Sequence, residues 1–230
     1  METQNLETRK IGDIVTDNFK AAEIFKRHGI DFCCGGNTSL QQACDEKKLD
    51  VSILSQELQN LADLPPDNSH NFKEWKLDFL CDYIVNTHHS TVNKLLPQLL
   101  IYTRKIADVH GHHAELIQIA DLFAQLHDEL LTHLKSEEEI LFPAIKDVLK
   151  TGSDQSRETI KSEISRMSKE HEFAGAAMDN INKLSSNYLL PPDACNTYAV
   201  TYKLLEQFED DLHIHVHLEN HILYPKALEL

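Results

Sequence analysis

One motif occurs twice in this chain, and it restricts the possible fold more than any other feature. Residues 133–143 align without gaps with residues 215–225, and both segments follow the pattern His-x3-Glu-x2-Ile-Leu-aromatic-Pro. The two copies lie 82 residues apart. The same offset relates His89 to His171, and in each half this histidine precedes the motif by 44 residues. An internal repeat of this kind indicates two structurally similar halves.

The region that carries the repeat is expected to be helical throughout. Apolar residues recur at steps of three and four, as in Leu95 and Leu99, which is the spacing of one helix face. Helix breakers are rare, because the chain has only 7 Gly and 7 Pro. Breaks are expected near 109–112, 151–154 and 187–193. This pattern predicts four helices of about 35 residues each, and therefore a four-helix bundle in an all-α protein.

The spacing within the motif places a histidine and a glutamate on one helix face. Residues i and i+4 project from the same side of a helix. Two related halves would therefore direct four imidazoles and two carboxylates into the bundle core: His89, His133, His171, His215, Glu137 and Glu219. Burying these groups alone would be costly, whereas two metal ions would satisfy them, with two histidines per ion and each glutamate able to bridge. Imidazole and carboxylate without thiolate favour iron or manganese over zinc.

Other histidines are weaker candidates for this centre. His88 adjoins His89 and lies on an equally apolar stripe, so that only the repeat favours His89. Three further histidines, His213, His217 and His221, have the i, i+4 spacing of a zinc site but lack counterparts in the first half.

Five more polar residues lie near the predicted ligands or near a predicted loop. His110, His112 and His113 are expected beside a loop and in solvent, with His110 a candidate to support the centre from outside. Glu129 and Glu170 are expected on solvated faces, although either could orient a ligand.

A small N-terminal domain is expected before the bundle. The run Pro-Pro-Asp-Asn-Ser at 65–69 stops any helix, so a linker at 65–71 is predicted to divide residues 1–64 from residues 72–230. Thr16 or Asp17 can cap a helix that ends before Gly29.

Two further helices are expected in this domain. Ser39 with Gln42 forms a capping box for the first of them, and the second is expected at 51–62.

The cysteines do not predict a disulfide scaffold. Their number is odd and their spacing irregular, and without an export signal reduced thiols are expected. Cys33 and Cys34 precede Gly35 and Gly36 near a predicted helix start, where the helix dipole would favour thiolate and the glycines would leave the sulfurs approachable. The alternative is two small apolar residues in a turn. The remaining cysteines are expected in the core or as neutral surface residues: Cys44, Cys81 and Cys195.

The net charge and the lack of long apolar runs argue against nucleic-acid and membrane partners. Acidic residues outnumber basic ones by 37 to 22, for a net charge of −15, which opposes binding to nucleic acid or anionic membranes. No apolar run is long enough for a membrane span, and the first ten residues lack the apolar stretch of a signal peptide. A soluble, cytoplasmic protein is therefore expected.

Four segments are distinctive: Asp31-Phe-Cys-Cys-Gly-Gly36, His133-x3-Glu137 with Ile-Leu-Phe-Pro, Glu170-His171-x3-Gly175, and His215-x3-Glu219 with Asn220 and Ile-Leu-Tyr-Pro. Through these segments, and over essentially its whole length, the sequence resembles the repair-of-iron-centres (RIC) family, of the YtfE and ScdA type. The resemblance implies a hemerythrin-like four-helix bundle with two non-haem iron ions per chain, bridged by an oxo group and carboxylates. It assigns His89, His133, His171 and His215 as terminal ligands, Glu137 and Glu219 as bridges, and an accessory role to Cys33 and Cys34.

The family resemblance implies repair of iron–sulfur clusters damaged by nitric oxide or peroxide, by donation of iron to damaged client proteins. On this hypothesis Cys33 and Cys34 receive the iron or dock the client. One alternative is an enzyme that reduces nitric oxide at two adjacent irons. Another is a sensor or carrier that binds oxygen or nitric oxide without chemistry. A dizinc hydrolase is least favoured, because no separate nucleophile or phosphate-binding loop is visible. A homodimer is compatible with the sequence.

Overall fold

The computed structural model describes residues 6–62 and 71–230. These residues form helices and no β-strand apart from one isolated bridge, so the all-α prediction is confirmed. The chain divides into two compact units, residues 1–80 with 216–229 and residues 81–215 with 230. The predicted Pro-Pro-Asp-Asn-Ser breaker at 65–69 lies outside the described residues, and the linker at 65–71 stays a prediction.

The unit that contains the N-terminus is built from short helices, and two of its three predicted helix-end signals are present. The Ser39–Gln42 capping box is present, and Gly29 has a φ of +63°, as expected. The predicted cap at Thr16 or Asp17 is wrong, because these residues end a helix and the next one begins only at Ala21. The helices are α1 (Ile11–Asp17), α2 (Ala21–Arg27), α3 (Leu40–Lys47) and α4 (Val51–Ala62).

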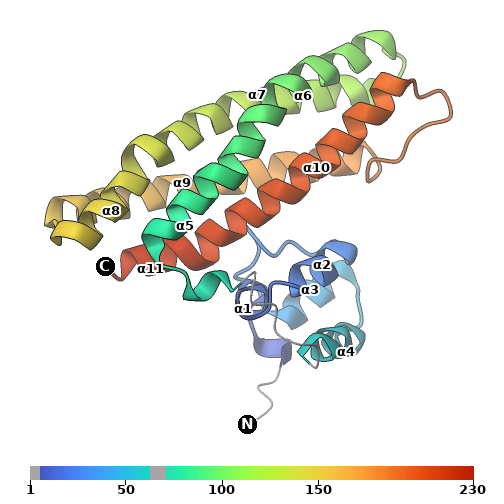
Figure 1. Ribbon diagram of the computed structural model, residues 1–230. Coiled ribbons are helices and arrows are strands. Elements are labelled where there is room, and N and C mark those ends of the chain that lie inside the picture. The colour runs from blue at the N-terminus through green and yellow to red at the C-terminus, as the bar shows by residue number, and fades with distance from the viewer. Residues whose placement is uncertain (1–5, 63–70) are drawn as a thin grey trace. The chain divides into compact units, whose positions relative to one another are not determined.

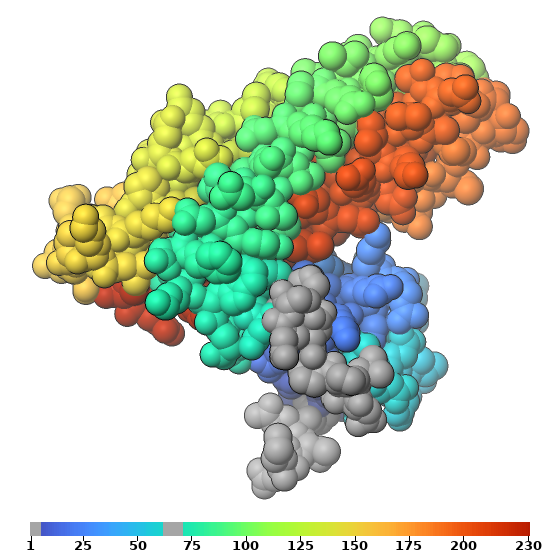
Figure 2. All heavy atoms as spheres, viewed as in Figure 1, coloured from blue at the N-terminus to red at the C-terminus, as the bar shows by residue number. Residues whose placement is uncertain are grey.

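The second unit contains most of the bundle. Figure 1 shows four long helices lying side by side: α6 (Ser90–Val109), α7 (Ala114–Ser136), α9 (Asp154–Leu184) and α10 (Asn196–Leu218). The edge of Phe123 packs on Phe208 in the core, with ring centroids 5.6 Å apart. In Figure 2 the side chains of α6 and α10 meet along the face in view. The other α-helices of the described residues after position 71 are α5 (Leu77–Ile84), α8 (Phe142–Thr151) and α11 (Tyr224–Leu228).

The predicted breaks between the bundle helices are confirmed. Gly152 ends α8 with a φ of +72°, and Ser153 then caps α9 by accepting a hydrogen bond from the backbone N–H of Ser156. A left-handed glycine followed by a hydroxyl cap is a common way to stop one helix and start the next. Within the described residues, no helix is both long enough and apolar enough to span a membrane.

Within the described part of the chain, three π-helical turns interrupt the long helices, at Val85–His89, Glu137–Leu141 and Glu219–Leu223. Pro143 and Pro225 follow two of these turns by two residues. Proline lacks an N–H and clashes with the carbonyl four residues earlier, which favours a widened turn. Such turns are frequent at functional sites. Each one begins or ends at a predicted ligand: His89, Glu137 and Glu219.

Candidate metal centre

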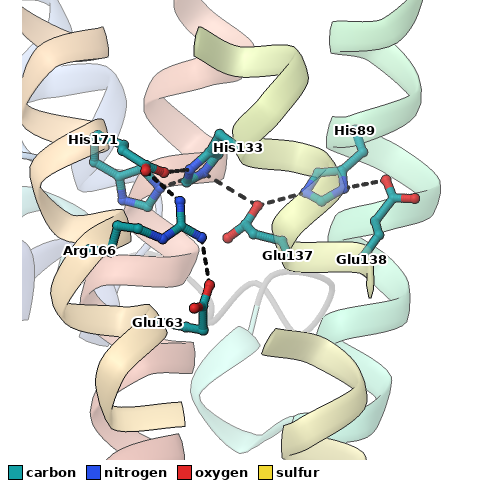
Figure 3. Close-up of polar contacts among 8 residues, drawn as sticks. His89, His133, Glu137, Glu138, Glu163, Arg166 and His171 are labelled. Atoms are coloured by element: carbon teal, nitrogen blue, oxygen red, sulfur yellow. Dashed lines mark hydrogen bonds and ion pairs between the residues drawn. The ribbon is translucent and has the colours of Figure 1, made fainter. Parts of the chain in front are cut away.

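Glu137 occupies the middle of the predicted centre. Its side chain is fully buried at the point where α7 passes into a π-helical turn. Its Oε2 lies 3.2 Å from Nε2 of His89 and 3.4 Å from Nε2 of His133 (Figure 3). A carboxylate in this environment needs positive charge close by, either on the imidazoles or on a bound cation.

The imidazoles around Glu137 form two groups that share this carboxylate. Ligand atoms of His89, Glu137 and His215 lie within 4.8 Å of one another, and so do those of His133, Glu137 and His171. In the second group, the two Nε2 atoms of His133 and His171 are 3.0 Å apart. All five side chains are buried. Imidazole nitrogens that converge in this way have the geometry and the chemistry of cation ligands.

Glu219 occupies the equivalent position in the second copy of the motif. It is fully buried and follows His215 by four residues in a continuous helix, with a ligand atom of each within 4.8 Å of the other. The i, i+4 relation of His133 and Glu137 is therefore repeated, as the sequence predicted.

Two of the predicted histidine ligands have a carboxylate beside the ring nitrogen Nδ1. Nδ1 of His133 lies 2.7 Å from Glu170, which also pairs with Arg166, and Nδ1 of His89 lies 2.8 Å from Glu138 (Figure 3). The hydrogen bond with His133 and the Arg166 charge lower the pKa of Glu170, although burial opposes them. A carboxylate at Nδ1 fixes the tautomer that points the Nε2 lone pair at a metal.

The sequence predicted that Glu170 lies on a solvated helix face, whereas in the structure its carboxylate contacts Nδ1 of the predicted ligand His133. Glu138 was missed altogether. It directly follows Glu137 and therefore faces another side of the helix, so that no periodic signal marks it. Glu129 is exposed, as predicted.

The alternative histidines lie elsewhere. Nδ1 of His88 contacts Asp211 at 3.0 Å, and His88 belongs to neither group. His217 and His221 face the cysteine loop rather than a metal, with ring nitrogens 3.3 Å from the carbonyl oxygen of Phe32 and 2.7 Å from that of Cys33. Burial lowers the pKa of His217 to about 3, so this imidazole is neutral at physiological pH.

The cysteine loop is organised by Asp31. Its carboxylate accepts hydrogen bonds from the backbone N–H groups of Cys33, Cys34 and Gly35. Cys33 is buried and Cys34 is half-buried, with their sulfurs 3.9 Å apart.

The expected activation of this cysteine pair by a helix dipole is wrong for Cys33. The hydrogen bond with Cys34, burial and the charge of Asp31 all raise the pKa of the Cys33 thiol. The nearest following helix begins only at Leu40.

Gly35 and Gly36 were predicted to leave the cysteine sulfurs approachable, but the structure gives another reason for a glycine in this loop. Within the described residues a positive φ among glycines occurs at Gly29 and Gly152, and not in this loop. At Gly36 a Cβ would instead overlap Nε2 of His221 and lie 2.5 Å from the carbonyl oxygen of Phe32. A glycine is therefore needed because the His221 ring and the backbone approach so closely.

Among the other cysteines, Cys44 and Cys81 are buried, as predicted. Cys195 was expected in the core or as a neutral surface residue, and it lies at the surface. It is exposed, and a hydrogen bond with Nε2 of His110 at 3.2 Å lowers the pKa of its thiol to about 7.

The fold and the site define a class of protein: a four-helix bundle whose core carries buried histidines and glutamates that could hold metal ions. Residues 82–227 match the family model described as the hemerythrin HHE cation binding domain. Residues 7–62 match ScdA_N, described as a domain of unknown function (DUF542).

Relatives match nearly the whole chain. The iron-sulfur cluster repair protein ScdA of Staphylococcus haemolyticus is 37% identical over 218 residues, which cover 94% of this chain and 96% of the relative. The iron-sulfur cluster repair protein YtfE of Escherichia coli O8 is 32% identical over 222 residues, covering 95% and 96%. The chain therefore belongs to the ScdA/YtfE family of hemerythrin-domain proteins.

Proposed function

We propose that this protein holds two iron ions in its bundle and repairs iron–sulfur clusters damaged by nitrosative or oxidative stress by donating iron. The observation that carries the proposal is the sharing of the buried carboxylate of Glu137 by two pairs of imidazoles. The names of the relatives, which are iron-sulfur cluster repair proteins, support it.

Each group would hold one ion. His89 and His215 would bind the first iron, and His133 and His171 would bind the second. Glu137 would bridge the two ions, and its repeat counterpart Glu219 would act as the second bridge. When bound, the iron pair supplies the cargo and the redox activity. The assignment of His89 rather than His88 rests on the 3.2 Å approach of His89 to Glu137.

The ligand set suits release as well as binding. Two imidazoles per ion and shared carboxylates leave open coordination positions, and they hold iron(II) less tightly than a thiolate cage. Glu170 and Glu138 each connect a buried imidazole to solvent, since 26% and 40% of their side chains are exposed. They can hold the Nδ1 proton of His133 and His89 while the Nε2 atoms act as ligands.

The test is metal analysis with Mössbauer spectroscopy on iron-grown protein, alone and with a damaged iron–sulfur client. We expect two irons per chain, with a decline as the client regains its cluster. The double variant Glu137→Leu with Glu219→Leu should lose iron and repair together, whereas the exposed control Glu129→Leu should keep both. Full repair by an iron-free double variant would contradict the proposal.

A second candidate function follows from the same shared carboxylate. Two adjacent irons can hold two small molecules side by side, so reduction of nitric oxide is the alternative. Catalytic formation of nitrous oxide with full retention of iron would favour this enzyme over a donor. Reversible binding of oxygen or nitric oxide, with neither turnover nor iron loss, would instead indicate a sensor or carrier.

A further inference from the structure

A second cluster of metal-binding side chains lies in two loops of the bundle unit. One loop follows α6 and carries three histidines, and the other precedes α10 and carries Asp193 and Cys195. Figure 1 shows these connections at the same end of the bundle. The iron proposal uses none of these residues.

The side chains of the two loops are in direct contact. Nε2 of His112 lies 2.9 Å from Oδ2 of Asp193, and Nε2 of His110 lies 3.2 Å from Sγ of Cys195. Ligand atoms of His110, His112 and Asp193 all lie within 4.8 Å of one another. Ligands around a tetrahedral zinc ion are separated by about 3.4 Å, so small shifts bring these three groups to binding distance.

We propose that His110, His112 and Asp193 bind a divalent transition-metal ion of the zinc type, with Cys195 as the fourth ligand. Two imidazoles, a carboxylate and a thiolate are a donor set that zinc accepts in tetrahedral geometry. The bundle core offers imidazole and carboxylate without thiolate, so the two sites select different metals.

The surroundings organise this cluster for binding. The expectation that His110 lies in solvent is wrong, because the residue is buried. Its ring packs against Tyr198 with centroids 5.3 Å apart, so that one ligand is held in place. His113 lies outside the group of three but supports it, since its Nε2 is 3.1 Å from Asp193 and its Nδ1 is 3.0 Å from Glu115. Such a partner orients a ligating carboxylate from outside.

The remaining ligand is accessible and chemically suited. Cys195 follows Asp193 by two residues and is exposed, so packing does not prevent its side chain from rotating toward an ion. Its sulfur already lies 3.2 Å from Nε2 of His110, and a cysteine sulfur is a ligand that zinc accepts beside imidazole.

The test is titration of the iron-loaded, full-length protein with Co²⁺, which reports thiolate ligation by a charge-transfer band in the near ultraviolet. We expect one Co²⁺ per chain with this band, no change in iron content, and loss of the band on addition of Zn²⁺. Cys195→Ser should abolish the band. His112→Ala should weaken Co²⁺ binding by more than about 10-fold, because the loss of a direct ligand costs more than the loss of an outer contact.

Matched controls distinguish this cluster from the other thiols and histidines. Cys34→Ser and His127→Ala should keep the band and the affinity of the unmodified protein, because neither residue belongs to the cluster. The absence of Co²⁺ binding to the iron-loaded protein would overturn the site. Binding without the band, or a band that survives Cys195→Ser, would overturn Cys195 as a ligand.

Discussion

Replacing Glu170 by glutamine tests how far the contacts around the predicted ligands control iron retention. The Glu170 carboxylate lies 2.7 Å from Nδ1 of His133 and is clamped by Arg166. Glutamine keeps the size of the side chain but removes its charge, so that a charge-assisted hydrogen bond becomes a neutral one. That change is worth about 1–1.5 kcal/mol. Because 26% of the side chain is exposed, solvent screening places the effect at the lower end of this range.

We therefore expect Glu170→Gln to weaken the binding of one iron by about 5-fold, which is the factor that corresponds to about 1 kcal/mol. The assay is anaerobic competition with an iron(II) chelator, monitored until both irons are removed. One of the two irons should leave more readily and the other should be unchanged. Glu172→Gln, two residues along and exposed, is the control. The reasoning is refuted if the two variants lose iron equally, or if neither differs from the unmodified protein.

Two further predictions concern the cysteines and their loops. Gly36→Ala should destabilise the protein by about 1–3 kcal/mol, because its Cβ would overlap His221, whereas Gly111→Ala has its nearest contact at 3.5 Å and should be tolerated. Denaturant unfolding measures both, and equal stabilities would contradict the close approach. Alkylation of Cys195 should rise with pH around 7, because the thiolate reacts; His110→Ala should move this midpoint up toward about 8.5, the value of a free thiol. An unchanged midpoint would show that the imidazole does not lower the pKa.

The helices and the candidate ligands among the histidines were predictable, because helix periodicity is local and the repeat marks equivalent positions in the two halves. The 82-residue repeat identifies His89 and His171 only through their relation to the His-x3-Glu motifs, and the structure places each within a group around Glu137. The Ser39–Gln42 capping box and the helix stop at Gly152 are likewise decided by neighbouring residues. Helix spacing and capping act over a few residues, so the amino-acid order was enough to specify them.

The contacts that set the charge state and the orientation of these side chains were decided only by the tertiary structure. The pairing of Glu170 with His133 spans 37 residues, and that of Cys195 with His110 spans 85. A nearby helix start was expected to favour thiolate at Cys33, but the protein buries this residue beside Asp31, which raises the pKa of its thiol. The charge state and orientation of a side chain depend on burial and on whichever group the fold brings within a few ångströms. Those distances arise only when distant segments pack together.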